Sequence, residues 1–432
     1  MARYTFLIFC LLLALQGRSQ FNGVPMDEQM NIPVHLTAAD SLGNLYVAYD
    51  SKTIGFRTAN LHVQKWNGLF WTKLPVLPLT EHLNDSAHQM EMVIYNGQVT
   101  VIGSFKSVNG INGVARWTGS QWAKNGSLNS NYFPHDEISV KATAIYDHKL
   151  FVVGDFNRAD SAPVKNLAVF NGLVWNGLAT GGAKRFDCLT TSGGDLYLSG
   201  RFSAIEGNVV KDLARFEGSA WSAVAHNFDT ITELTDFGGA LAVITPDEVT
   251  FLNGSTWTKL TPASFSVTEC ESALFINGKL YLTGRFNLKG ESNIRLVSID
   301  RTSTDILLRE NDLSEFDHAP LSLVTDNLTV YLTGGYRSLF GKPVYNIAQF
   351  KPGFTAVSGV VFEDMNGNCS MDAGEIPLPT MLIKVNGGSF YTSTDDMGRY
   401  TVFVPNNRTA TIEIITGDEH IAKCGDYEQI LT

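Results

Sequence analysis

The stretch that decides the fold is Leu196-Tyr-Leu-Ser-Gly-Arg-Phe202, followed after a polar loop by Asp212-Leu-Ala-Arg-Phe216 and Trp221. Its first half is an alternating apolar run that ends in Gly-x-Phe or Gly-x-Tyr, and this half returns at Gly103, Gly154, Gly284 and Gly334. Its second half returns at Trp117–Trp122, Phe170–Trp175 and Leu252–Trp257. A sequence motif that recurs in this way predicts a repeated supersecondary unit whose copies pack side by side, because no single copy can bury its own apolar face.

Seven copies are marked by the residue that opens the apolar run, at intervals of 39 to 54 residues: Leu45, Val99, Leu150, Leu196, Leu241, Leu280 and Val330. The third copy reads as four short strands over residues 142–146, 150–156, 166–170 and 173–178. Four-stranded units repeated at this spacing predict an all-β fold, a seven-bladed β-propeller over residues 20–356, with six or eight blades as alternatives. Asn171-Gly172 predicts a two-residue hairpin turn with positive φ at both residues, as do Asn67-Gly68 and Asn253-Gly254.

The signature residues have structural roles in this interpretation. We expect the glycine to end a strand where a Cβ would collide with the next blade, and the aromatic residue after it to fill the gap between blades. The seventh copy has little chain left for an outer strand after Phe350. Residues 21–34 are therefore expected to supply that strand and close the ring.

The first 19 residues have the pattern of a secretory signal peptide. Arg3 precedes the apolar run Phe6 to Leu15, and the small residues Gly17 and Ser19 stand before a cut at Gln20. We therefore expect a secreted or cell-surface protein of bacterial type, monomeric and not inserted in a membrane once the leader is removed. Removal of this leader takes the formal charge from −11 to −13, which disfavours nucleic acid as a partner.

The repeats over residues 35–356 resemble kelch-like propeller repeats and, more closely, the repeats of large secreted bacterial proteins. This resemblance implies the fold and says little about activity, since propellers host both binding and catalysis. The histidines are scattered and form no metal-ligand motif. Asp155, Arg201 and Arg285 follow signature glycines and could form a polar funnel for a ligand, or be solvated loop charges.

The segment after residue 356 is acidic and has its own motif. Oxygen-bearing side chains stand at positions 1, 3, 5, 7, 9 and 12 of a loop: Asp364, Asn366, Asn368, Ser370, Asp372 and Glu375. This spacing is typical of a Ca²⁺ loop that ends in a bidentate Glu, and the alternative is a metal-free turn. Cys369 stands where such loops carry glycine, and the flanking residues predict strands in place of helices, so the expected calcium site is structural.

Residues 357–420 resemble the calcium-binding B-type domain of serine-aspartate-repeat adhesins. The match includes Gly359, Phe362, Thr394, Gly398 and Tyr400 besides the loop itself. It implies a small transthyretin-like (prealbumin-like) β-sandwich over residues 357–432, incomplete at its C-terminal end if further chain follows. Leu378-Pro379-Thr380 lacks the rest of a sortase signal.

The four cysteines outside the leader divide into two pairs. Cys188 and Cys270 lie in non-adjacent repeats, and we expect them to be buried free thiols. Cys369 and Cys424 lie in the acidic segment, where an exported chain can keep a disulfide between them or hold two separate thiols.

Two functions from different classes fit these patterns. The first is a non-enzymatic binding or adhesion protein, whose propeller presents a face to an extracellular glycan or protein and whose calcium-stiffened sandwich is a spacer or adhesive module. The second is a carbohydrate-active enzyme with its catalytic carboxylates in the propeller loops. Two Asp or Glu carboxyl groups about 5 to 10 Å apart in an axial pocket would favour the enzyme, and a shallow mouth without such a pair would count against it. From the sequence we favour the non-enzymatic protein and expect no catalytic residues.

Overall fold

The computed structural model describes residues 5–7, 21–23, 33–52, 59–81, 90–107, 109–130, 138–178, 180–181, 185–314, 321–365, 371–385, 390–405, 409–415, 422–424 and 428–430. The chain forms two compact units, one of residues 22–349 and one that combines residues 1–21 with 350–432. No helix in the described ranges is long and apolar enough to cross a bilayer. The expected signal peptide and the 357–432 domain boundary stay predictions.

The larger unit consists of seven antiparallel four-stranded blades, with each strand paired to the next. Blade 1 is β3 (Leu36–Ala39), β4 (Leu45–Lys52), β5 (Ala59–Trp66) and β6 (Trp71–Lys73). Blade 2 is β8 (Met90–Tyr95), β9 (Gln98–Ser107), β10 (Asn112–Trp117) and β11 (Trp122–Lys124). Blade 3 is β13 (Ser139–Tyr146), β14 (Lys149–Asp155), β17 (Leu167–Phe170) and β18 (Trp175–Gly177).

The remaining blades repeat this order. Blade 4 is β20 (Arg185–Ser192), β21 (Asp195–Arg201), β24 (Leu213–Phe216) and β25 (Trp221–Ala223). Blade 5 is β26 (Glu233–Asp236), β27 (Leu241–Ile244), β28 (Val249–Asn253) and β29 (Thr256–Lys259). Blade 6 is β30 (Ser266–Ile276), β31 (Lys279–Leu288), β32 (Glu291–Ile299) and β33 (Thr304–Arg309). Blade 7 is β35 (Ser322–Thr325), β36 (Val330–Thr333), β39 (Ile347–Phe350) and β2 (Asn22–Gly23).

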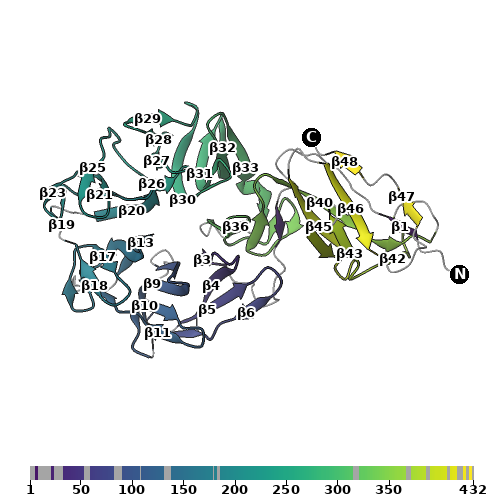
Figure 1. Cartoon of the computed structure of the whole chain (residues 1–432), viewed down its shortest axis with the longest axis horizontal. Helices are drawn as coiled ribbons and strands as arrows, with labels where there is room; N and C mark the ends of the chain where they lie inside the picture. The colour runs from purple at the N-terminus through teal and green to yellow at the C-terminus, as the bar shows by residue number, and fades with distance from the viewer. Residues whose placement is uncertain are drawn as a thin grey trace. The chain divides into compact units, whose positions relative to one another are not determined.

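The first strands of the seven blades form the inside of the ring. Each of them contacts the first strand of the next blade, and β35 of blade 7 contacts β3 of blade 1, so the circle is complete. Figure 1 shows these strands arranged around a common axis. The unit is therefore an all-β seven-bladed propeller, as the repeat count predicts.

The ring is closed by the N-terminal segment. Asn22 and Gly23 pair antiparallel with Gln349 and Ala348, so β2 is the outer strand of blade 7. Phe21, immediately before β2, lies 4.8 Å from Phe350 between ring centroids. The expected closure is confirmed for the residues that pair.

Short strands outside the four-stranded pattern join neighbouring blades. β7 (Leu77–Glu81) pairs with β5 of blade 1 and β9 of blade 2. β12 (Leu128–Asn129) leaves blade 2 and pairs with the β15–β16 hairpin (Arg158–Ala159, Ala162–Pro163) of blade 3. The same device recurs as β19–β22–β23 (Thr180–Gly181, Ala204–Ile205, Asn208–Val209) and β34–β37–β38 (Leu313–Ser314, Ser338–Leu339, Lys342–Pro343).

The signature aromatic residues are core, as expected. Phe105, Phe156, Phe202, Phe286 and Tyr336 are all buried. In blades 2, 3 and 5 the indole Nε1 of the outer-strand tryptophan donates a hydrogen bond to a backbone carbonyl just after the preceding blade: Trp122 to Pro75 (2.7 Å), Trp175 to Asn125 (3.0 Å) and Trp257 to Ala225 (2.9 Å). These three tryptophans thus connect their blades to the ones before them.

Two details of the turns and glycines correct our expectations. A Cβ on Gly154 would overlap the carbonyl oxygen of Ser139 in the same blade, so the signature glycine makes room for its own inner strand and not for the next blade. The asparagines of the Asn-Gly turns have no positive φ, whereas Gly68 and Gly172 do, at 91° and 95°. Asn67 instead accepts hydrogen bonds from the backbone N–H groups of Leu69 and Phe70 through its side chain, which makes the loop one of four residues.

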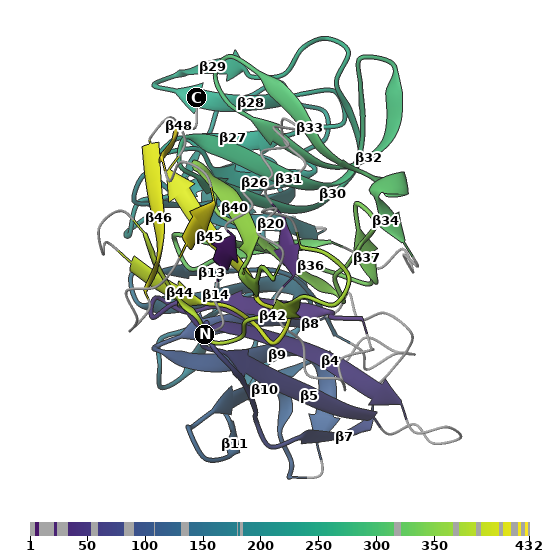
Figure 2. The ribbon, with the colours of Figure 1, turned by 90° about the vertical axis from the view of Figure 1, so that its right-hand side faces the viewer.

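The smaller unit is also built of strands. β40 (Phe354–Val360) pairs with β45 (Arg399–Pro405), and Figure 2 shows the two side by side. A second sheet has the order β44 (Phe390–Ser393), β43 (Leu382–Val385), β46 (Thr409–Ile415), β48 (Glu428–Ile430). A third has the order β42 (Ile376–Pro377), β41 (Phe362–Glu363), β1 (Thr5–Leu7), β47 (Ala422–Cys424).

Side chains from the first two sheets meet in one apolar core. Val402 and Val404 of β45 lie in it with Ile383 and Val385 of β43 and with Ile412 of β46. A core shared between two sheets is the arrangement that a small sandwich requires. The assignment of this unit to a transthyretin-like sandwich stays a prediction.

Candidate functional site

Charged residues stand at equivalent places on the innermost strands. In blades 3, 4 and 6 one residue of the innermost strand faces the signature glycine, and the residue after it has no partner on the neighbouring strand. This extra residue makes a β-bulge, and it is Lys141, Asp187 and Glu271 in the three blades. In blade 2 Met90 faces Gly103, and the next residue is Glu91, with no bulge. Bulges re-aim side chains and are common beside active sites, so this level of the ring is a candidate place for chemistry.

Glu91 of β8 and Glu233 of β26 are two carboxyl groups on innermost strands, in blades 2 and 5, and each side chain is half-buried. Burial raises the pKa of Glu91 to about 7, and the negative charge of Glu233 raises it further in the same direction. Burial likewise raises the pKa of Glu233 to about 7, against the lowering effect of a hydrogen bond that the Leu234 N–H donates to it. These two residues are called the axial carboxylates below.

A third carboxylate at this level is neutralised by a buried arginine. The Arg295 guanidinium donates to Glu271 at 2.7 Å, with side chains 0% and 6% exposed. The other Glu271 oxygen accepts a hydrogen bond from the Leu321 N–H at 2.9 Å, which ties blade 6 to blade 7. Glu271 is therefore a structural group, because both of its oxygens are used within the protein.

The two thiols near the axial carboxylates are inert. Cys188 and Cys270 are free, as expected, but only Cys188 is fully buried and Cys270 is half-buried. The Cys188 thiol donates to the Thr232 carbonyl at 3.4 Å, next to Glu233. Burial raises the pKa of both thiols well above the usual value, and the charge of Glu233 adds to this. Thiols held protonated at neutral pH are poor nucleophiles and poor metal ligands.

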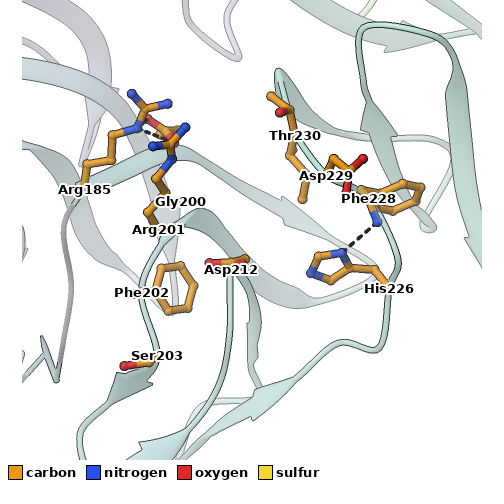
Figure 3. A pocket seen from close by; sticks show the side chains of 12 residues that line it. Arg185, Gly200, Arg201, Phe202, Ser203, Asp212, His226, Phe228, Asp229 and Thr230 are labelled. Carbon is orange, nitrogen blue, oxygen red and sulfur yellow. Dashed lines mark hydrogen bonds and ion pairs between the residues drawn. The ribbon is translucent and has the colours of Figure 1, made fainter.

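A pocket of about 500 Å³ opens between blades 4 and 5 at the end of the ring where β20 and β26 begin. Figure 3 shows Arg185 and Arg201 side by side on one wall, with Phe228, Asp229 and Thr230 on the facing wall. The rings of His226 and Phe228 stack at 5.6 Å and 15°. We call this cavity the arginine pocket.

The arginine pocket borders the axial carboxylates through the chain. Asp187 lines it, and the next residue, Cys188, bonds to Thr232. Thr230 and Ile231 line it as well, two positions before Thr232 and Glu233. A second cavity of about 740 Å³ lies by the turns at the opposite ends of these strands, beside Tyr146 and Ser192, and holds none of these charged groups.

The expected polar funnel is present only in part. Arg201 lines the arginine pocket. Arg285 instead pairs with Glu269 at 3.5 Å, and Asp155 is an exposed side chain opposite Ser139. The structure thus places one of the three residues in a cavity and does not bring the three together there.

The expected calcium loop is described only at its two ends. Asn366, Asn368, Ser370 and Cys369 lie outside the described residues, so the ligand set and the Cys369–Cys424 bridge stay predictions. Asp364 and Glu375 are 2% and 8% exposed. The Glu375 carboxylate accepts the backbone N–H groups of Met365 (3.1 Å) and Asp372 (2.8 Å), which draws the ends of the loop together. Within the described ranges, no three His, Cys, Asp or Glu residues are grouped to hold a metal.

The axial carboxylates were missed by sequence reasoning. A signal for Glu91 does exist, since an acid between Met90 and Met92 interrupts an apolar strand. Glu233 opens a fifth copy that lacks the Gly-x-Phe signature, and its sequence context is ordinary. Its proximity to Glu91 follows only from closure of the ring.

Comparisons with known proteins rest on structure, since no family model and no curated protein matches this chain. One similar structure is the extracellular domain of a one-component system protein from B. thetaiotaomicron, at TM-score 0.46 and 10% identity, covering 94% of this chain and 59% of that one. The chain thus spans less than two thirds of that structure. Others are an alpha-L-arabinanase from Penicillium chrysogenum (TM-score 0.35, 11% identity, 67% and 97% covered) and an alpha-L-arabinofuranosidase from Fusarium graminearum (TM-score 0.35, 10%, 81% and 98%).

These findings correct the expectation of a non-enzymatic adhesion protein without catalytic residues. Two of the three structures above are glycan-cleaving enzymes. Within the described residues, two half-buried carboxyl groups also stand on innermost strands of the ring, Glu91 in blade 2 and Glu233 in blade 5, and the charge of Glu233 raises the pKa of Glu91.

Proposed function

We propose that the propeller is a carbohydrate-active enzyme that cleaves glycosidic bonds in an extracellular glycan, with the axial carboxylates as its acid and base pair. The observation that carries this proposal is that two carboxyl groups, Glu91 and Glu233, stand on innermost strands of the ring, where burial raises the pKa of each to about 7 and the charge of Glu233 adds to the effect on Glu91. Glycosidic cleavage commonly uses two such carboxyl groups, one protonated and one ionised. Carboxyls whose pKa lies near the working pH are suited to exchanging protons with a substrate.

The two carboxyls have distinguishable roles. The Leu234 N–H donates to Glu233 at 3.0 Å, and a hydrogen bond to a carboxylate favours its ionised form. The negative charge of Glu233 in turn adds to the burial that raises the pKa of Glu91. The first proton therefore resides on Glu91, which donates it to the leaving glycosidic oxygen. Glu233 remains ionised and acts as the base for water or as the nucleophile.

The surroundings of the pair support this division of roles. Glu271 is held by Arg295 and the Leu321 N–H, so it takes no part in the proton exchange. The thiols of Cys188 and Cys270 stay protonated and add no competing charge. Two coupled carboxyls are thus left to share a proton at this level of the ring.

Extracellular location and a calcium-bound C-terminal unit belong to the same proposal. The leader-like residues 1–19 support export, and an exported chain meets both extracellular glycans and millimolar Ca²⁺. Asp364 and Glu375, buried at the ends of the loop, would be ligands together with Asn366, Asn368, Ser370 and Asp372. The ion would stiffen the turn between β41 and β42 and supply no catalytic chemistry.

The test is release of reducing sugar by the full chain from a panel of neutral and acidic polysaccharides. Glu91→Gln and Glu233→Gln are expected to lower the rate at least a hundredfold, since each removes one member of the pair. Glu269→Gln is the matched control, because Glu269 lies on an innermost strand but is 54% exposed and paired with Arg285. Full activity in either axial variant would overturn the assignment, and so would the same loss in the control.

A further inference from the structure

Blade 4 differs from blade 6 in the charges at one pair of facing positions. The residue after the signature glycine faces a residue of the innermost strand, and in blade 6 these two are Arg285 and Glu269, an ion pair at 3.5 Å. In blade 4 the same two positions hold Arg201 and Arg185. Like charges directly opposite each other on a strand pair destabilise it, so the fold alone gives no reason for this arginine pair.

The two arginines differ in how their charge is compensated. Arg185 pairs with Asp187, the bulge residue of the same strand, at 2.9 Å. The Arg201 side chain, in contrast, makes no ion pair or hydrogen bond with any residue that the structure describes. Its guanidinium lines the arginine pocket with its donors available. An anion bound there would relieve the repulsion that the strand pairing creates.

The other walls of the pocket narrow the chemistry of that anion. Three carboxylates line the same cavity as the arginines: Asp187, which pairs with Arg185, and Asp212 and Asp229. The stacked pair of His226 and Phe228 lines it as well. The carboxylates would repel a doubly charged phosphate, whereas they accept hydrogen bonds from hydroxyl groups. A flat aromatic pair can pack against the C–H face of a sugar ring. A volume of about 500 Å³ accommodates one or two sugar residues.

We propose that the arginine pocket is a subsite for an acidic sugar, a uronic acid residue of the glycan. Its single carboxylate binds the guanidinium of Arg201, and its hydroxyl groups donate to Asp212 and Asp229. This inference rests on the proposed function and names its substrate class. The pocket residues Thr230 and Ile231 come directly before Thr232 and Glu233 in the chain, so the subsite lies at the start of the strand that carries this carboxylate.

The experiment measures binding and not turnover. D-galacturonate and D-glucuronate oligosaccharides, and the same oligosaccharides with their carboxyl groups reduced to alcohols, are titrated into the full chain by calorimetry. We use the Glu91→Gln/Glu233→Gln chain as background so that no probe is consumed. At least one acidic series should bind more tightly than its reduced counterpart, and Arg201→Gln should weaken only the acidic series, by about tenfold to a hundredfold. Arg285→Gln, at the same position of blade 6, should leave binding unchanged.

Arg201→Glu separates a binding role from a structural one. It places an acid opposite Arg185, as in blade 6, so the melting temperature should rise while acidic-sugar binding is lost. Acidic and reduced oligosaccharides that bind equally, or Arg201→Gln without effect, would overturn the inference. Binding that depends on Arg201, in a chain that cleaves no glycan, would instead sink the proposed function alone. If the chain cleaved only neutral glycans and Arg201→Gln left that cleavage unchanged, the subsite inference would fail and the proposed function would stand.

Discussion

Replacing Glu271 by Gln tests how the propeller tolerates a charge at its centre. The substitution keeps the size of the side chain but removes the negative charge that faces the Arg295 guanidinium at 2.7 Å. Since the two side chains are 6% and 0% exposed, water cannot replace the lost carboxylate. Removing one partner of a buried ion pair typically costs about 3–5 kcal/mol of unfolding free energy. Glu269→Gln removes an exposed pair on the same strand and should cost no more than about 1 kcal/mol.

The assay is equilibrium unfolding in urea at pH 8, well above the usual pKa of a glutamate, because burial raises the pKa of Glu271. A second variant, Glu271→Met with Arg295→Met, should recover most of the stability, because it removes both buried charges at once. The reasoning fails if Glu271→Gln and Glu269→Gln lower the urea midpoint equally. It also fails if the double variant is the least stable of the three.

Three further outcomes can be measured on the same protein. Gly154→Ala should lower the free energy of unfolding by about 1–3 kcal/mol, since its Cβ overlaps the Ser139 carbonyl, and an unchanged urea midpoint would contradict the role given to the signature glycine. The axial carboxylates have a folded pKa of about 7 against an ordinary 4.5, so the folded chain holds more protons between these values and its melting temperature should fall as pH rises from 4.5 to 7. Glu91→Gln/Glu233→Gln should flatten that slope, and an unaltered slope would show that other groups cause it. Removing Ca²⁺ with a chelator should lower the melting temperature of the C-terminal unit in the wild type and in Glu363→Gln but not in Glu375→Gln; a chelator with no effect on the wild type would mean that the loop binds no structural calcium.

The propeller could be predicted because its information is local and repeated. The seven residues that end in Gly200-Arg201-Phe202 predict a strand, the point where it ends and the aromatic residue that packs in the core. The other copies repeat this pattern. The strands that join the blades could not be predicted in the same way. β12 is Leu128–Asn129, too short to carry a periodic pattern, and it becomes a strand only because β15 of the next blade lies beside it.

The site shows the same division between local and global information. The oxygen spacing from Asp364 to Glu375 is a local pattern and predicts a calcium loop on its own. The axial pair has no such pattern, because Glu91 and Glu233 belong to blades 2 and 5 and interact only once the ring is complete. The place of Arg201 directly after a signature glycine is a local pattern that marks it as a candidate binding residue. That Arg185 lies opposite it follows only from the strand register.

The strand that closes the ring has a consequence for how the chain is made. β2 leaves the ribosome early, yet its partner β39 follows 327 residues later, counted from Asn22 to Gln349. During synthesis, β2 therefore stays unpaired until β39 has been made, when almost the whole propeller has emerged. A contact this distant in sequence forms late and slowly. A fusion or truncation that prevents residues 22–23 from pairing therefore affects the last step of folding. It leaves six blades complete and blade 7 without its outer strand.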